Sequence, residues 1–216
     1  MAERPTLYTS PGSHHSRRVA LLIHELGVDV EQRHVDVRPP GMGGETESEA
    51  FLALNPNGKV PVLVDGDLTV FESNAIMAYL CDRYGPTELY PEDRARRALV
   101  QQWQYWQAAH LSPTADGLLG EHTLKPMMGG APDEATVAQL EAEFHRWATV
   151  LDKTLKRREH LAGPSLTCAD LSVATALMYA TAARLPVAEH APLDAWLARV
   201  QSRPSWKDTT PPPLPV

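Results

Sequence analysis

Two hydroxyls and two imidazoles crowd into one turn near the start of the chain. In LYTSPGSHHSRRV, residues 7–19, the side chains of Ser13, His14, His15 and Ser16 follow a Pro-Gly pair and precede an expected helix. Four backbone N–H groups are open at a helix N-terminus, and the helix dipole favours negative charge there. A hydroxyl at that place could therefore donate to an anion. The alternative is that Ser13 or Ser16 is only a helix cap.

A proline stands at the start of an apolar run in NGKVP, residues 57–61. Proline cannot donate to a sheet ladder, so Pro61 indicates either an edge strand or a turn-like break, such as a cis bond, in an interior strand. A break would leave the backbone groups of Val60 free to pair with an extended, peptide-like ligand. Both interpretations stay open on the sequence alone.

An acidic residue and a hydroxyl meet in FESN, residues 71–74. Ser73 can cap the helix expected to follow it, and capping alone would explain its presence. The same helix N-terminus can bind a carboxylate, and Glu72 can accept from an ammonium group. Together they predict a receptor for a zwitterionic amino-acid group.

The sequence predicts no bound metal ion. His14 and His15 are adjacent, so on a helix their side chains should diverge by about 100° and not chelate one ion. The cysteines, Cys81 and Cys168, show neither CxxC nor any other metal spacing and are too few for a disulfide framework. A reducing, cytoplasmic setting is expected, with the histidines as polar walls or proton partners of a site.

The first 85 residues are predicted to alternate between strands and helices. A helix beginning near Ser16 has apolar residues at i, i+3, i+4 and i+7 and ends at Gly27. The turn Asp65-Gly66-Asp67 indicates a hairpin. The expected strands are residues 6–9, 31–37, 60–64 and 68–71, with further helices at 48–54 and from 73 onward.

The second part of the chain is predicted to be helical throughout. Residues 85–91 contain two prolines and a glycine and are expected to link two domains. Beyond them the pattern predicts helices at residues 93–119, 133–158, 167–185 and 193–202. Thr167 with Asp170 three residues later is typical of a capping box, to which we assign no chemistry. The pattern predicts a small α/β domain followed by an all-α domain.

Charge and composition exclude several classes of function. The chain has 216 residues and a net charge of −7, and 43% of its residues are hydrophobic. Nucleic-acid binding is not expected, because it requires a surplus of positive charge. No apolar run reaches the 18 residues of a membrane span, and the N-terminus carries no apolar signal segment. We therefore expect neither membrane insertion nor secretion.

These segments together resemble the cytosolic glutathione transferases over nearly the whole chain. NPNGKVP (55–61) and DGDLTVFESNAI (65–76) are similar to family signatures, close to the phi and theta classes. LTCADLS (166–172) and QSRPSW (201–206) resemble segments of the family's helical domain. The resemblance implies a thioredoxin-like domain at 1–84, a linker at 85–91 and an all-helical domain at 92–216. It indicates a bacterial, serine-type member that uses glutathione as co-substrate.

The resemblance also implies roles for residues of the first domain. By position, Ser13 matches the catalytic serine of the phi and theta pattern, and His14 is the second choice. Tyrosine-type classes would carry Tyr at Thr9, and the cysteine-type beta class would carry Cys at His14, so this chain departs from both. The residues expected to contact glutathione are His15, Lys59, the backbone of Val60 beside a cis Pro61, Glu72 and Ser73.

One departure concerns the glycyl carboxylate of glutathione, which Lys59 is expected to face. Related chains carry basic residues where this one has Thr46 and Glu47, and an acid there should repel that carboxylate. Either Lys59 does more, or Arg38 in a differently built loop takes part.

The acceptor pocket is expected to come from the first helix of the second domain and its neighbours. Trp106 and His110 are four residues apart and share a helix face, and Met178 lies on a later helix. Such a pocket suits small apolar electrophiles. The homodimer is the usual assembly in the family, so the resemblance implies a homodimer here too. The alternatives are a glutathione-dependent dehalogenase, ether-cleaving enzyme or isomerase, or a non-catalytic binding protein of the same fold.

Overall fold

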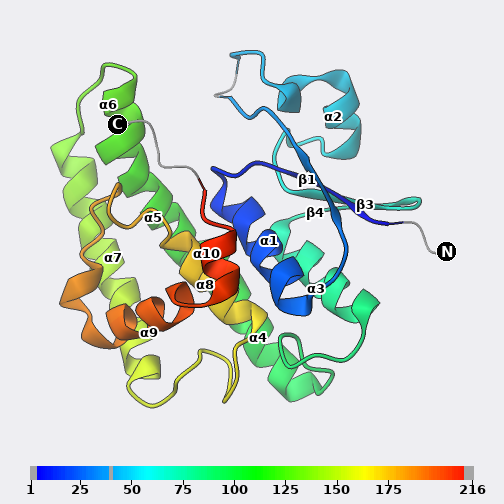
Figure 1. Ribbon diagram of the computed structural model, residues 1–216. Coiled ribbons are helices and arrows are strands. Elements are labelled where there is room, and N and C mark those ends of the chain that lie inside the picture. The colour runs from blue at the N-terminus through cyan, green and yellow to red at the C-terminus, as the bar shows by residue number, and fades with distance from the viewer. Residues whose placement is uncertain (1–3, 39–40, 212–216) are drawn as a thin grey trace. The chain divides into compact units, whose positions relative to one another are not determined.

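The computed structural model describes residues 4–38 and 41–211. Its elements fall into two compact units (Figure 1). The first holds β1 to α3 together with α10, and the second holds α4 to α9. The change of unit falls between Pro86 and Thr87, inside the segment 85–91 that the sequence predicts as a linker. The architecture is a mixed α/β unit and an all-helical unit, as predicted.

The first unit is built on a four-stranded sheet of order β2-β1-β3-β4. β1 pairs parallel with β2 and antiparallel with β3, which pairs antiparallel with β4. Its elements are β1 (Thr6–Thr9), α1 (His14–Leu26), β2 (Glu31–His34), the 3-10 helix η1 (Glu45–Glu47), α2 (Glu49–Leu54), β3 (Val62–Asp65), β4 (Leu68–Phe71) and α3 (Ser73–Tyr84).

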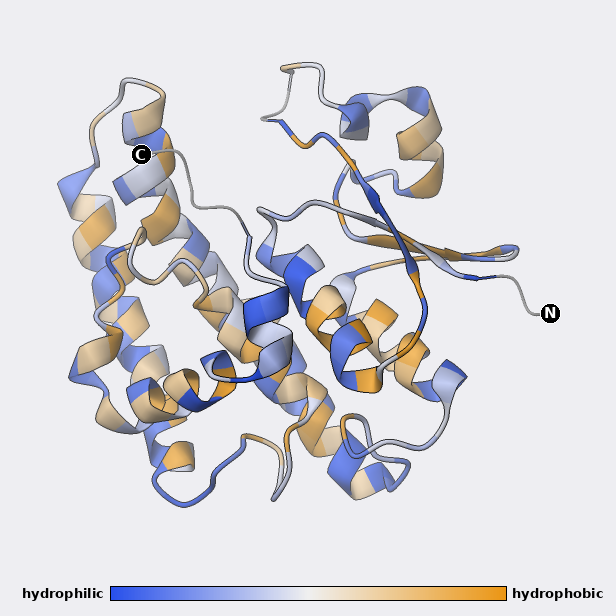
Figure 2. Cartoon of the chain, in the orientation of Figure 1, coloured by the Kyte–Doolittle hydropathy of each residue, from blue (hydrophilic) through white to orange (hydrophobic). Residues whose placement is uncertain are grey.

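Alternate strand residues point to opposite faces of the sheet, and each face has its own helices. Leu7 and Leu63 are fully buried, as are the core residues of α1 and α3, which pack against each other. Val62 belongs to a second cluster with Phe51 of α2. Apolar residues gather along β3 and β4 and along one side of α1 and α3, whereas β2 is hydrophilic (Figure 2).

Local signals in this unit placed most element ends correctly. Gly27 ends α1 in a left-handed conformation with φ 62°, and the hairpin turns at Gly66. β2 is shorter than predicted, ending at His34, and α1 begins at His14 rather than near Ser16. β3 begins at Val62, after a cis Val60–Pro61 bond, and it is an interior strand. The edge-strand interpretation of Pro61 is therefore wrong.

The short helix α10 (Pro204–Asp208) belongs to the first unit, although the sequence grouped residues 92–216 as one helical domain. The Arg17 guanidinium donates to the carbonyl of Trp206 at 2.9 Å and lies 4.0 Å from the centre of its ring. The Ser205 hydroxyl donates to Glu25, and His24 pairs with Asp208 at 2.9 Å. These long-range contacts, which no local pattern reveals, hold α10 on α1.

In the second unit, all regular elements among the described residues are helices. Its elements are α4 (Arg94–Trp106), the π-helix η2 (Gln107–Leu111), α5 (Ser112–Leu119), the π-helix η3 (Gly120–Leu124), α6 (Lys125–Met127), α7 (Glu134–Leu155), α8 (Cys168–Ala176), the 3-10 helix η4 (Val187–Glu189) and α9 (Ala191–Gln201). None of the described helices combines the length and apolar character needed to cross a membrane.

Two predicted helices of this unit are interrupted. The helix expected at 93–119 widens into a π-helix before Pro113, and a second π-helix precedes Pro126. Proline removes one N–H donor and its ring clashes with the preceding turn, so a wider turn accommodates it. The helix expected at 167–185 ends at Ala176 and continues as hydrogen-bonded turns. The Thr175 hydroxyl donates to the carbonyls of Leu171 and Ser172 there, and such back-bonding bends helices.

Candidate active site

The register of the sheet brings the three candidate segments to the same end of the strands. Tyr8 of β1 lies opposite Val62 of β3, which lies opposite Phe71 of β4. β1 and β4 finish at this end of the sheet, and β3 begins there. This end of the strands therefore carries the turn before α1, the segment before β3 and the start of α3.

Ser13 is the N-cap of α1. Its backbone is extended, with φ −91° and ψ 118°, and its Oγ accepts a hydrogen bond from the Ser16 N–H at 3.2 Å. A hydroxyl has one hydrogen to donate and two lone pairs, so the cap uses a lone pair only. Over residues 4–38 and 41–211, no acceptor takes the Ser13 hydroxyl hydrogen. Ser13 can therefore cap the helix and donate to an anion at the same time.

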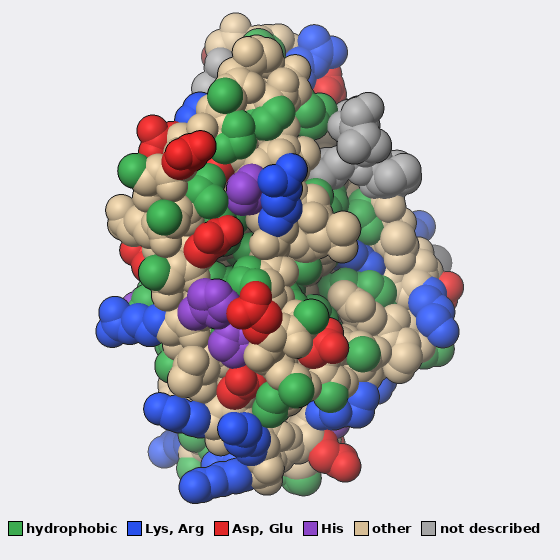
Figure 3. Space-filling view, turned by 90° about the vertical axis from the view of Figure 1, so that its left-hand side faces the viewer, with side chains coloured by type: hydrophobic (Ala, Val, Ile, Leu, Met, Phe, Trp, Pro, Cys, Tyr) green, Lys and Arg blue, Asp and Glu red, His purple; other side chains and the backbone are tan. Residues whose placement is uncertain are grey.

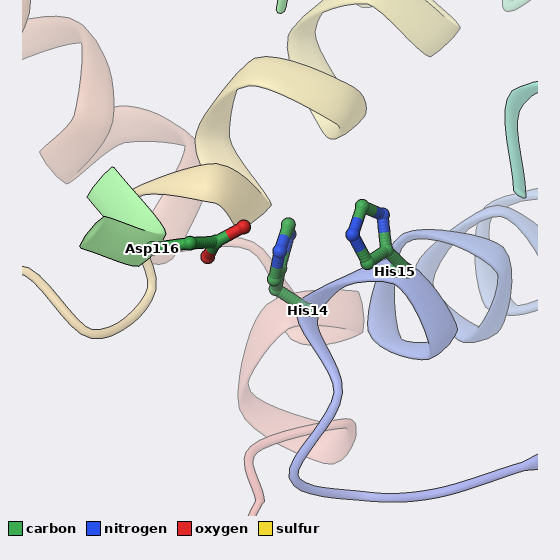
Figure 4. A group of neighbouring side chains, drawn as sticks. All are labelled: His14, His15 and Asp116. Atoms are coloured by element: carbon green, nitrogen blue, oxygen red, sulfur yellow. The ribbon is translucent and has the colours of Figure 1, made fainter. Parts of the chain in front are cut away.

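His14 and His15 open α1 with their rings close together (Figure 4). The ring centroids are 3.9 Å apart, so the expectation that the two side chains diverge is wrong. No turn precedes the first helical residue, and its side chain is therefore less restricted than one in the helix interior. His14 Nδ1 lies 3.1 Å from Arg18 Nη2. A guanidinium only donates, so Nδ1 accepts and the proton of neutral His14 is on Nε2.

The surroundings of His15 disfavour a positive charge on its ring. Burial lowers its pKa from 6.5 to about 2, and electrostatic interactions with His14, Arg18 and Lys59 contribute in the same direction. His15 is therefore neutral at physiological pH. The same surroundings favour an anion, since cationic side chains collect at a helix N-terminus with no acidic residue in its first turn.

Arg18 is a site residue that the sequence reasoning missed. It is 1% exposed and lies one helical turn after His14. The i, i+4 spacing of an imidazole and a guanidinium was the available signal.

The segment before β3 offers unpaired backbone. Asn55 Nδ2 donates to the Lys59 carbonyl at 2.7 Å and holds this turn. Gly58 has φ 61°, and a Cβ on it would lie 3.2 Å from the Thr46 carbonyl oxygen, so a side chain is disfavoured there. Within the described chain, the N–H and C=O of Val60 have no backbone hydrogen-bond partner. The Val60 backbone is thus available to an extended ligand.

The N-terminus of α3 is also open. The N-cap is Glu72, not Ser73, and no side chain caps the helix. Capping as the explanation of Ser73 is therefore wrong. Glu72 has a positive φ of 72°, which a non-glycine residue rarely adopts and which is common at binding sites. Ser73 is the first helical residue and is buried. Their placement fits a carboxylate at the open N–H groups and an ammonium at Glu72.

Glu47 has a role within its own loop. Its carboxylate oxygens accept from the N–H groups of Gly41 and Gly43. Two charge-assisted hydrogen bonds hold the negative charge at this loop. Arg38, the alternative partner for a glycyl carboxylate, pairs with Asp36 at 2.8 Å, whereas Lys59 is exposed.

The predicted acceptor residues of the second unit are partly brought together. Trp106 and His110 form an edge-to-face pair with ring centroids 6.1 Å apart. Trp147 of α7, which the sequence did not single out, stacks on His110 at 4.6 Å. Met178 is half-buried in the turns that follow α8. The use of these side chains as a pocket remains a prediction.

The order of elements defines a thioredoxin-like sheet unit followed by an all-helical unit, with a cis-proline and the N-termini of α1 and α3 at the same end of the strands. Residues 7–88 match the family model of the glutathione S-transferase N-terminal domain, and residues 109–204 match that of the C-terminal domain. The chain belongs to the glutathione S-transferase family.

Relatives from plants resemble the chain over most of its length. Glutathione S-transferase 3 of Zea mays is 35% identical over 94% of this chain and 91% of its own. A glutathione S-transferase of Hyoscyamus muticus is 33% identical over 88% of this chain and 89% of its own.

Solved structures agree with this fold. Glutathione transferase F7 from Populus trichocarpa matches with a TM-score of 0.85 and 28% identity, over 95% of this chain and 97% of its own. Glutathione S-transferase-I bound with lactoylglutathione matches with a TM-score of 0.84 and 27% identity, over 96% of this chain and 99% of its own.

Proposed function

We propose that this protein transfers glutathione to small apolar electrophiles and that Ser13 stabilises the glutathione thiolate. The observation that carries the proposal is the state of the Ser13 hydroxyl. Its lone pair accepts from the Ser16 N–H while its hydrogen has no acceptor among the described residues. Ser13 then acts as a hydrogen-bond donor to sulfur and not as a nucleophile.

The energy required is within reach of these groups. A thiol with pKa near 8.5 is about 3% ionised at pH 7. Lowering that pKa to about 6.5 takes about 2.7 kcal/mol of preferential stabilisation of the thiolate. A charge-assisted hydrogen bond contributes about 1.5–3 kcal/mol, and the α1 dipole adds about 0.3–1 kcal/mol.

In this proposal the rest of glutathione binds to the segments at the same end of the strands. The backbone of Val60, beside cis Pro61, pairs with the cysteinyl part, because its N–H and C=O have no backbone hydrogen-bond partner among the described residues. Glu72 binds the γ-glutamyl ammonium, and the open start of α3 at Ser73 binds the carboxylate. Lys59 faces the glycyl carboxylate, and neutral His15 lines the site.

The acceptor side and the setting are part of the same proposal. Trp106, His110 and Met178 form the apolar pocket for the electrophile, supported by the aromatic contact of Trp106 with His110. The protein is a serine-type enzyme that works in the cytoplasm as a homodimer. The predicted bacterial origin also stays a prediction, and the relatives named above come from plants.

The test compares Ser13→Ala with the hydroxyl-retaining Ser13→Thr. Ser13→Ala should lower kcat by about 10-fold or more, while calorimetry still detects glutathione binding. The ultraviolet difference spectrum of the bound thiolate should be lost in Ser13→Ala and kept in Ser13→Thr. Unchanged activity in Ser13→Ala, together with its loss in His14→Ala, would make the His14 Nε2–H the donor instead.

A further inference from the structure

A hydrogen-bonded cluster of two histidines and a carboxylate lies in the second unit. His145 and Asp152 are on α7, and His190 directly precedes α9. His145 Nδ1 lies 3.0 Å from His190 Nε2, and His190 Nδ1 lies 3.0 Å from Asp152 Oδ2. Glu189 Oε2 lies 3.9 Å from the remaining nitrogen of His145, Nε2.

The Asp152 carboxylate determines which nitrogens of His190 and His145 carry a proton. Asp152 only accepts when ionised, so His190 Nδ1 carries a proton and donates it. The other nitrogen of neutral His190, Nε2, then has a lone pair. That lone pair accepts from the Nδ1–H of His145. The hydrogen bond from His190 Nδ1 to Asp152 therefore fixes the orientation of the ring, so the lone pair on His190 Nε2 points toward His145.

The surroundings fix one histidine and leave the other accessible. The His190 side chain is 11% exposed, and its ring packs edge-to-face on the buried Phe144 ring at 6.2 Å. The second oxygen of Asp152 accepts from the Leu193 N–H at 3.1 Å, which fixes the carboxylate. The His145 side chain is 43% exposed. Histidine side chains gather beside acidic ones on the face that carries α6, α7 and α9 (Figure 3).

We propose that His145 Nδ1 and His190 Nε2 bind one divalent transition-metal ion, with Zn²⁺ as the probe. In a tetrahedral site with bonds of about 2.05 Å, two nitrogen ligands lie about 3.3 Å apart. The two nitrogens are already 3.0 Å apart, so a small tilt of the accessible His145 ring opens the position. Water completes the coordination.

Both ligand rings have a carboxylate on the side away from the ion. Asp152 already accepts from His190 Nδ1–H. When the ion takes the lone pair of His145 Nδ1, the ring proton moves through solvent to Nε2, which faces Glu189. Each imidazole stays neutral and keeps one proton, so no net proton is released. Carboxylates in these positions orient metal-binding histidines and make them more basic.

The experiment is calorimetric titration of the chelator-treated protein with ZnCl₂. The wild type should bind one equivalent that His145→Asn loses or binds at least about 10-fold more weakly. His24→Asn is a matched control, since His24 also faces one carboxylate, Asp208 at 2.9 Å, and its side chain is 41% exposed. Zinc bound at other imidazoles, such as His14, would persist in His145→Asn. Equal binding by His145→Asn and the wild type would overturn the proposal.

A second variant separates metal binding from folding, because His190 is buried and its loss could unfold the unit. Asp152→Asn retains both ligands but removes the charge that orients His190, and it should weaken zinc binding by about 10-fold or more. Anomalous diffraction at the zinc edge should place the ion about 2.0–2.1 Å from His145 Nδ1 and His190 Nε2. An ion at any other place on the molecule, with none here, would also overturn the proposal.

Discussion

α1 and α8 are both capped by a residue with a hydroxyl side chain, Ser13 and Thr167, but the two helix N-termini serve different purposes. At α8, Asp170 Oδ2 accepts from the Thr167 N–H at 2.9 Å, and its Oδ1 accepts from the Leu161 N–H and from Trp196 Nε1. Asp170 is completely buried. At α1, Ser13 Oγ accepts from Ser16, and no acidic residue stands in the first turn.

The difference lies in where the compensating negative charge comes from. α8 carries its own carboxylate, so its open N–H groups and positive dipole end are satisfied within the fold. α1 has cationic neighbours and a hydroxyl with a hydrogen to donate, so its N-terminus is better satisfied by an external anion. A helix N-terminus that lacks its own acid is thus the stronger candidate for a binding site, provided that other groups converge on it.

The largest effect is expected at the closed terminus. Asp170→Ala should lower the free energy of unfolding by about 3–5 kcal/mol, because it removes the acceptor of four buried donors. These are the N–H groups of Leu161 and Thr167, the Thr167 hydroxyl and Trp196 Nε1–H. Denaturant unfolding measures this. Asp133→Ala is the matched control, since Asp133 caps α7 through one exposed bond to the Thr136 N–H and should cost about 1 kcal/mol. Equal losses of unfolding free energy in the two variants would show that buried Asp170 contributes no more than an ordinary exposed N-cap.

The pH dependence of stability should reveal how strongly the α1 terminus rejects a cation. The folded pKa of His15 is about 2 and the unfolded value is 6.5, so between these values the unfolded chain binds more protons. Stability from this residue is complete above pH 6.5 and falls by up to about 1.4 kcal/mol per pH unit below it. His15→Asn should make the decline between pH 6.5 and 4.5 shallower in denaturant unfolding. His34→Asn, a surface imidazole of the same unit, controls for removing a histidine, and an unchanged slope in His15→Asn would contradict the assigned cause.

The cap itself should matter less for stability at α1 than the buried acid does at α8. Ser13→Ala should lower the free energy of unfolding by about 1 kcal/mol, the usual cost of a lost N-cap. Its effect on turnover should therefore not come from unfolding. A loss as large as that of Asp170→Ala would make Ser13 mainly structural and weaken its assignment as thiolate donor.

The smallest effect is expected from the exposed cation near the open terminus. Lys59→Ala should raise the KM for glutathione by about 2–5-fold with little change in kcat, because an exposed ion pair contributes about 0.5–1 kcal/mol. Steady-state kinetics at two salt concentrations measures this, and the wild-type advantage should shrink at high salt. Arg38→Ala tests the alternative partner. A pure loss of kcat in Lys59→Ala would contradict a carboxylate-binding role.

Local patterns predicted much of the first unit because their causes are local. Gly27 supplies the left-handed conformation that ends α1, and Asp65-Gly66-Asp67 forms the hairpin turn. Ser13, named from its place before a helix, is the cap. The patterns failed where distant contacts or backbone competition decide, as in the turns after Ala176 and in the packing of α10 on α1. Arg18 was missed because the i, i+4 spacing of His14 and Arg18 was not considered.

The sequence by itself determined the α/β and all-helical halves, the capping residues and the three segments that carry the candidate site. These features depend on periodicity, turn chemistry and caps, which act over a few residues. Only the tertiary structure decided that α10 packs on α1 and that His145 meets His190. It also decided that the Val60 backbone lacks a hydrogen-bond partner among the described residues. The two histidines are 45 positions apart, and packing of helices, not local spacing, brings their nitrogens within 3.0 Å.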